Sequence, residues 1–194
     1  MSKPFDRVAL IGLGLLAGSI SLAARRVPGA PLFSGFARRP ETRETARRIG
    51  LVDRVDESIA EAVSDADLVI LCVPVGAMES VAREMAPHLK PGAVVSDVGS
   101  VKADVIRAVA PHLPEHAVRV PAHPLAGTEH SGPESGFASL YDGRFCVLTP
   151  EPGTAPEAIA RVGAFWESLG TTVEEMEPEH HDLVRAVTSH APHL

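Results

Sequence analysis

Protonatable and hydroxyl side chains gather in two short segments that each follow an apolar run. The segment VPAHPLAGTEHSG, residues 120–132, places His123 just after such a run. An imidazole titrates near neutral pH, so it can take the proton of a hydroxyl group while a hydride leaves the same carbon. The segment VSDVGSVK, residues 95–102, adds Ser100 at the start of an expected helix, where a serine by default caps the helix. A base and a hydroxyl at these positions predict the oxidation of an alcohol.

A third segment, VALIGLGLLAGS, fits the pattern GxGxxA between an expected strand and an expected helix. Gly12 permits the tight turn, and Gly14 lets a pyrophosphate approach the free N–H groups of the helix. Ala17 and Gly18 let the helix lie close to the sheet. Packing alone also favours glycines at a buried turn, but the position and spacing favour a dinucleotide. The expected cofactor-binding residues here are Gly12, Gly14, Leu15 and Leu16.

The end of the second expected strand, in GFARRPE, indicates which dinucleotide binds. NAD-binding proteins usually place an acid there to hold the ribose 2′-hydroxyl, but Ala37 stands at that position and Arg38 and Arg39 follow. Arginines suit a 2′-phosphate, so the segment favours NADP over NAD and leaves the use of both open. The alternative is that the two arginines are solvated surface charges. Val73 and Pro74, at the end of the third strand, either border the adenosine half or simply end the strand.

The elements around these segments repeat one pattern of apolar run, turn and amphipathic helix. Continuous apolar strands that alternate with helices predict an α/β fold of the Rossmann type, a doubly wound, mainly parallel sheet with helices on both faces. The expected strands are 7–11, 32–36, 68–73, 93–98, 117–120, 145–148 and 171–176. The expected helices are 15–26, 40–49, 56–63, 77–89, 101–113, 155–169 and 178–194.

His123 is expected to leave the fifth strand at the carboxyl edge of this sheet, where open α/β sheets bind ligands. Pro124 is expected to prevent further pairing, and Gly127 to let the chain turn over the site. Glu129 is expected either to orient the imidazole or to cap a turn, and His130 to lie on the surface. An isolated histidine more often has a structural role, but a place beside a dinucleotide turn favours an acid–base role.

Composition limits the classes of partner. The 194 residues suffice for one well-cored domain, and the formal charge of -7 argues against nucleic-acid and anionic-membrane partners. The apolar run 8–24 is shorter than the roughly 20 residues that span a membrane. Cys72 and Cys146 lie in apolar, β-branched runs, so we expect two buried free thiols in a reducing compartment, the cytoplasm.

Four motifs together resemble a known family. GLGLLAGS, DVGSVK, HPLAGTEHSG and TSHAPH occur in the order and at the separations of the prephenate/arogenate dehydrogenases of tyrosine biosynthesis, also called cyclohexadienyl dehydrogenases. The resemblance covers the whole chain, and HPLAGTE after VGSVK is its most specific part. It implies NAD(P)-dependent oxidative decarboxylation of prephenate or arogenate to 4-hydroxyphenylpyruvate or tyrosine.

The resemblance also implies roles for single residues. His123 would be the catalytic histidine that bonds the ring hydroxyl of the substrate, and Ser100 would lie near that hydroxyl and the nicotinamide. Ser189, His190 and His193 would face the substrate from the helix that joins two domains. With Glu129 beside His123, the expected substrate-binding residues are Ser100, Glu129, Ser189, His190 and His193.

The domain organisation follows from the same resemblance. Residues 1–176 are expected to form the dinucleotide-binding domain, and 177–194 to begin the helix that leads to a C-terminal helical domain. That domain, missing after Leu194, would supply the family's substrate-binding arginine and the interface of a homodimer. Ala191 replaces the leucine usual between the motif histidines, and we expect it to alter packing only.

Three alternatives are weighed against this interpretation. A Rossmann dehydrogenase acting on β-hydroxy acids shares the glycine turn but has no reason to contain HPLAGTE. A non-catalytic cofactor-binding module would tolerate the loss of His123. A metal site would draw on the histidines near the end of the chain, but no cysteine pair or HExxH motif accompanies them, so no metal is expected. Those histidines are His180, His181, His190 and His193, of which the first two are expected to form a solvated helix start.

Overall fold

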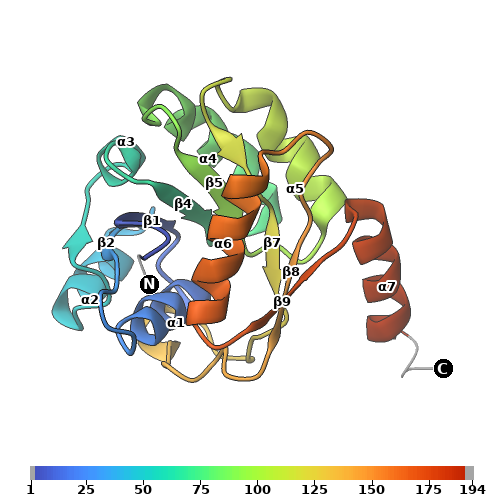
Figure 1. Ribbon diagram of the computed structural model, residues 1–194. Helices are drawn as coiled ribbons and strands as arrows, with labels where there is room; N and C mark the ends of the chain where they lie inside the picture. The colour runs from blue at the N-terminus through green and yellow to red at the C-terminus, as the bar shows by residue number, and fades with distance from the viewer. Residues whose placement is uncertain (1–2, 191–194) are drawn as a thin grey trace.

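The computed structural model describes residues 3–190 and contains two sheets with helices around them (Figure 1). The larger sheet has six strands in the order β3-β2-β1-β4-β5-β6. They are β1 (Arg7–Ile11), β2 (Leu32–Phe36), β3 (Arg54–Val55), β4 (Leu68–Leu71), β5 (Val94–Asp97) and β6 (Val118–Arg119). All neighbouring strands run parallel, so their carboxyl ends share one edge. This confirms the predicted Rossmann-type sheet, to which the structure adds the short β3.

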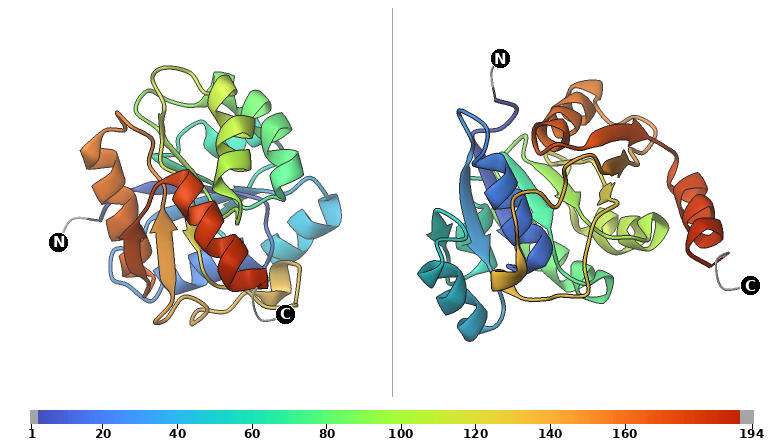
Figure 2. Two further views of the ribbon diagram at one scale, coloured as in Figure 1. Left: turned by 90° about the vertical axis from the view of Figure 1, so that its right-hand side faces the viewer. Right: turned by 90° about the horizontal axis from the view of Figure 1, so that it is seen from below.

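Helices cover both faces of this sheet because its central strands are apolar on both sides. In β1, Val8 and Leu10 join one buried cluster, and Ala9 and Ile11 join the other. The first cluster lies under α1 (Leu15–Ala24), α2 (Pro40–Arg48) and α6 (Pro156–Ser168). The second lies under α3 (Ile59–Val63), α4 (Val75–Met85) and α5 (Lys102–Val109). Figure 2 shows these layers from two further sides.

Two helices end earlier than predicted, each at a proline. α4 passes into the short 3₁₀ helix η1 (Ala86–His88), and α5 passes into η2 (Ala110–His112). Pro87 and Pro111 lie inside these turns, where the missing N–H and the bulky ring prevent an α-helix from continuing. The predicted helices 77–89 and 101–113 are therefore too long at their carboxyl ends.

A second, three-stranded sheet holds His123, and the sequence did not predict it as a separate unit. Its strands are β7 (Ala122–Pro124), β8 (Phe145–Leu148) and β9 (Thr172–Glu175), with β7 antiparallel to β8. The expectation that Pro124 prevents pairing is wrong, because Pro124 lies opposite Cys146 in the β7–β8 register. β7 is the edge strand of its sheet, and an edge strand tolerates a residue without an N–H group.

The last described element, α7 (Pro178–His190), packs against α5 at the margin of the molecule (Figure 1). A 3₁₀ turn, η3 (Pro133–Ser135), lies in the long loop between β7 and β8 and contacts α1. Within residues 3–190, no helix has the length and apolar character that a bilayer crossing requires.

Candidate active site

The turn between β1 and α1 is shaped by Gly12 and leaves space at Gly14. Gly12 has a φ of +101°, and a Cβ there would lie 2.5 Å from the carbonyl oxygen of Cys72. Gly14 is the N-cap residue of α1, and a Cβ there would meet no atom within 4 Å. The first turn of α1 contains no acidic residue. The turn thus presents an uncrowded helix N-terminus, which suits an anion.

Residues from β2 and β4 border this turn. Val73 follows β4, and its Cγ1 would lie 2.9 Å from a Cβ on Gly12, so its side chain lies against the turn. Pro74 is exposed and is the N-cap residue of α4. At the end of β2, Ala37 is buried, whereas Arg38 and Arg39 are exposed.

Arg43 of α2 holds the end of β2 in place, a role that the sequence did not indicate. Its Nη1 donates hydrogen bonds to the carbonyl oxygens of Ala37 at 2.8 Å and Arg38 at 3.2 Å. Its Nη2 lies 2.9 Å from the Glu57 carboxylate, and its guanidinium lies over the Phe36 ring, 5.6 Å from the centroid. This anchoring fixes the backbone that presents the two exposed arginines.

His123 lies in β7 with its side chain almost enclosed, at 6% exposure. Its Nδ1 lies 2.8 Å from Nε2 of His181 on α7, and the two rings meet edge to face with centroids 5.0 Å apart. His181 is itself buried, at 4% exposure, whereas its neighbour His180 is exposed. The expectation of a solvated helix start is therefore wrong for His181, because α7 turns this residue toward β7.

Asp182 joins His181 to the start of α5. Its Oδ1 accepts hydrogen bonds from Nδ1 of His181 and from the N–H of Lys102, each at 2.8 Å. Its Oδ2 accepts the N–H of Ala103 at 2.9 Å, so the carboxylate caps α5 from a distant part of the chain. Burial by itself would raise the pKa of Asp182, but hydrogen bonds from the two α5 amides and from His181 outweigh burial and lower the pKa. The side chain is therefore an ionised acceptor at neutral pH.

A buried ion pair fastens β7 to the main sheet beside His123. Lys102 is 0% exposed, and its ammonium group binds the carboxylate of Asp97 at the end of β5. The same Nζ donates to the carbonyl oxygen of Ala122 at 2.6 Å. Asp97 also accepts the N–H of Gly99 at 2.7 Å. The ammonium group thus links the carboxyl end of β5 to the residue that precedes His123.

The loop between β7 and β8 ties this region to the glycine turn. The hydroxyl of Tyr141 donates a hydrogen bond to the carbonyl oxygen of Leu16 at 3.0 Å. Gly136 packs so closely on α1 that a Cβ there would lie 2.9 Å from the backbone at Gly18. Gly18 therefore makes room for this loop, in addition to the expected close packing of the helix. The second sheet is held against the first two turns of α1.

A pocket of about 320 Å³ opens beside His123. Its walls come from the end of β7, the residues that follow, and the residue that precedes β8. The lining residues are His123, Pro124, Leu125, Ala126, Gly127 and Arg144. Arg144 is exposed, so the pocket combines an imidazole with a guanidinium group. This combination suits an anionic substrate that carries a hydroxyl group.

The two cysteines, Cys72 and Cys146, are not suited to act as nucleophiles or bases. Cys72 and Cys146 are both free, as predicted, with Cys146 buried and Cys72 partly buried. Burial raises the pKa of both thiols well above its ordinary value, so both are neutral near pH 7. They contribute packing around the ends of β4 and β8.

Comparison with known proteins assigns the chain to a family. A sequence model described as "Prephenate dehydrogenase, nucleotide-binding domain" matches residues 20–175. The chain belongs to the prephenate dehydrogenase family. It is 44% identical over 190 residues to cyclohexadienyl dehydrogenase of Zymomonas mobilis, covering 98% of the chain and 64% of the relative. It is 31% identical over 195 residues to prephenate dehydrogenase of Bacillus subtilis, of which it spans 53%.

Solved structures of the prephenate dehydrogenase family have the same fold. Prephenate dehydrogenase from Aquifex aeolicus, in complex with hydroxyphenyl propionate and NAD+, superposes with a TM-score of 0.89 at 33% identity. The match covers 100% of this chain and 66% of that one. Arogenate dehydrogenase from Synechocystis gives a TM-score of 0.87 at 30% identity, covering 96% of this chain and 65% of that one.

The structure describes only some of the other predicted site residues. The prediction that Ser100 caps α5 is wrong, because the N-cap residue is Val101 and the capping side chain is Asp182. Glu129 and His130 are exposed, and the His123 ring forms a hydrogen bond with His181. The side chains of Ser189 and His190, and the whole of His193, lie outside the described residues. Within the described part of the chain, no cluster of three metal-ligating side chains occurs.

Proposed function

We propose that the complete gene product catalyses the NAD(P)-dependent oxidative decarboxylation of prephenate or arogenate. The observation that carries this proposal is a buried imidazole, His123, which is bonded to His181 and lines a pocket beside the dinucleotide-binding sheet. Such an imidazole is suited to remove the proton of an alcohol. The likeness to an enzyme solved with NAD+ and hydroxyphenyl propionate supports the same chemistry.

The glycine turn fits a dinucleotide. The space at Gly14 and the uncharged first turn of α1 leave room for a pyrophosphate, and Gly12 permits the turn that presents them. In this proposal Leu15 and Leu16 supply helix amides, and Val73 and Pro74 border the adenosine half. A dinucleotide held there would supply the acceptor for the hydride of the substrate's alcohol carbon.

The residues of the chain manage the proton and the charges of the substrate. His123 takes the hydroxyl proton of the substrate. The six-membered ring of the substrate then loses carbon dioxide and becomes aromatic, which makes the reaction effectively irreversible. Arg144, in the same pocket, is the group that we assign to a substrate carboxylate. The other proposed substrate-binding residues are Ser100, Glu129, Ser189, His190 and His193.

We infer a preference for NADP over NAD from the end of β2. No carboxylate stands at Ala37 to hold a ribose 2′-hydroxyl, and Arg38 and Arg39 are exposed where a 2′-phosphate would lie. The Arg39 guanidinium lies 3.7 Å from the Glu41 carboxylate, and water screens this exposed pair. A strong preference for NAD would show that Arg38 and Arg39 do not bind a 2′-phosphate of the cofactor.

The assembly of the complete protein is also a proposal. We take residues 1–176 as the dinucleotide-binding unit and 177–194 as the start of a connecting helix, and we propose a cytoplasmic homodimer. Leu183 on α7 is 62% exposed, and it is an apolar side chain that an interface would cover. The family resemblance supports the dimer, and the two free thiols support a reducing compartment.

The test of the function is a steady-state assay of the complete gene product, crossing prephenate and arogenate with NAD and NADP. His123→Asn is expected to lower kcat by roughly 10³-fold, because it removes the base, with the Kd for the cofactor unchanged. His130→Asn is the matched control, since His130 is exposed on the following loop. Unchanged turnover in His123→Asn would end the assignment of the base.

A further inference from the structure

A continuous line of hydrogen bonds connects the His123 imidazole to the start of α5. It runs from His123 through His181 to Asp182 and ends on the backbone N–H groups of Lys102 and Ala103. We propose that His181 and Asp182 are positioning residues that hold His123 in the tautomer with hydrogen on Nδ1, so that Nε2 accepts the proton of the substrate. The catalytic part of this inference rests on the proposed function.

The direction of the first hydrogen bond is set by Asp182. Its carboxylate accepts two backbone N–H groups, which cannot reverse their direction as a hydroxyl group can. An ionised carboxylate has no hydrogen to donate, so Nδ1 of His181 must be the donor in the bond between them. A neutral His181 then carries its one ring hydrogen on Nδ1.

The direction of the second hydrogen bond follows from the first. In this neutral ring with hydrogen on Nδ1, the Nε2 atom of His181 has only a lone pair to offer. Nδ1 of His123, 2.8 Å away, must therefore be the donor. Both imidazoles are more than nine-tenths buried, at 6% and 4% exposure, which limits exchange of these partners with water. Nε2 of His123 is left as the basic nitrogen of the ring.

The same line stabilises the charge that His123 acquires during turnover. A proton on Nε2 makes His123 an imidazolium, and its Nδ1–H still points along the line toward the negative charge of Asp182. Other charged or titratable groups lie on the elements packed around His123. They are Lys102 of α5, Asp97 of β5, Arg144 just before β8 and Cys146 of β8. Asp97 is already neutralised by Lys102, and the Cys146 thiol is neutral, so Asp182 is the carboxylate coupled to the imidazole.

The first experiment reads the tautomer without any reaction. Long-range ¹H–¹⁵N spectra of the histidine-labelled chain at neutral pH distinguish a ring nitrogen that carries hydrogen from one that does not, and His123→Asn assigns the signal. We expect hydrogen on Nδ1 of His123. Asp182→Ala removes the acceptor that fixes the His181 ring, so the hydrogen of His123 is expected to distribute between Nδ1 and Nε2. Hydrogen on Nε2 in the unmodified chain would overturn the proposal.

The second experiment measures pH profiles of kcat/KM for matched variants of the complete gene product. Asp182→Ala is expected to lower kcat by about tenfold or more, because His123 is no longer held in the single tautomer with a basic Nε2. His181→Gln keeps an acceptor for His123 and leaves the Asp182 cap of α5 in place. It is expected to retain about a tenth of the rate, and its acid limb is expected to move to lower pH because the imidazolium loses its coupling to Asp182. His180→Gln, the exposed neighbour, should change neither.

The outcomes separate a positioning role from a structural one. A loss of thermal stability in His181→Gln with an unmoved acid limb would overturn the proposal in favour of packing alone. The predicted tautomer together with a wild-type protein that turns over neither prephenate nor arogenate would refute the proposed function and leave the tautomer assignment intact.

Discussion

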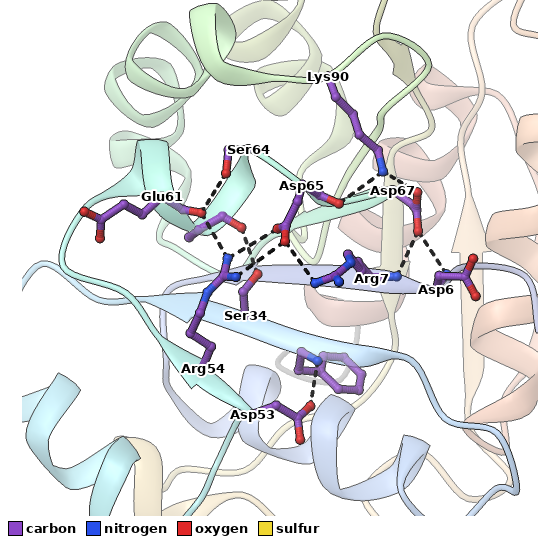
Figure 3. A network of polar contacts seen from close by, with 12 residues as sticks. Asp6, Arg7, Ser34, Asp53, Arg54, Glu61, Ser64, Asp65, Asp67 and Lys90 are labelled. Carbon is purple, nitrogen blue, oxygen red and sulfur yellow. Dashed lines mark hydrogen bonds and ion pairs between the residues drawn. The ribbon is translucent and has the colours of Figure 1, made fainter.

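The two ends of the six-stranded sheet use charged residues in opposite ways. At the amino end, Asp67 accepts hydrogen bonds from Lys90 and from two backbone N–H groups at the start of β1, within an open network of ion pairs (Figure 3). The side chains of Lys90 and Asp67 are 35% and 23% exposed. At the carboxyl end, the side chains of Lys102 and Asp97 are 0% and 4% exposed.

The difference in exposure separates ion pairs on the surface of the fold from an ion pair that positions the residues of the candidate site. An exposed pair gains at most about 1 kcal/mol, because water and salt screen it. A buried pair is costly to desolvate and contributes little net stability, but loss of one partner leaves a buried charge uncompensated. The buried pair at the carboxyl end therefore serves to position the backbone, since Lys102 binds the carbonyl oxygen of the residue that precedes His123.

Removal of one lysine from each end tests this comparison. Lys102→Met is expected to lower the free energy of unfolding by roughly 3–5 kcal/mol, because Asp97 remains buried without its cation. The matched Lys90→Met should cost about 1 kcal/mol or less, since Asp67 stays in contact with water. Urea denaturation measures both. Equal losses in the two variants would contradict the distinction.

A smaller effect sharpens the comparison within the carboxyl end. Gly12→Ala is expected to destabilise the fold by about 1–3 kcal/mol, because a φ of +101° strains an alanine and its Cβ would meet the Cys72 carbonyl. Gly14→Ala should cost at most about 1 kcal/mol at the helix N-cap. It should still weaken NADP binding by about tenfold, since its Cβ fills the space proposed for the pyrophosphate. Calorimetric titration and denaturation separate the two effects, and full NADP affinity in Gly14→Ala would refute the cofactor position.

The sequence predicted the features that adjacent residues determine. The glycine turn follows from Gly12 and Gly14 at fixed spacing between a strand and a helix, and the parallel sheet follows from continuous apolar runs. Helix ends were less well predicted, because the amphipathic pattern continues through Pro87 and Pro111 while the backbone does not.

The features that the sequence missed depend on long-range contacts. His181 and His180 are adjacent and chemically identical, and only the packing of α7 on α5 decides which of them meets His123. Asp182 caps a helix that begins 80 residues earlier, a pairing with no local signal. The sequence does not show that Pro124 lies on an edge strand, because that position depends on the distant partner strand β8.

The most direct test of the account is a crystal structure of the complete gene product with NADP+ and hydroxyphenyl propionate. The account predicts the phenolic oxygen at hydrogen-bond distance, about 2.6–3.2 Å, from Nε2 of His123. The carbon that bears this oxygen should lie about 3–3.5 Å from C4 of the nicotinamide ring. A nicotinamide ring bound away from the His123 pocket, or a phenol held without contact to that imidazole, would contradict the account.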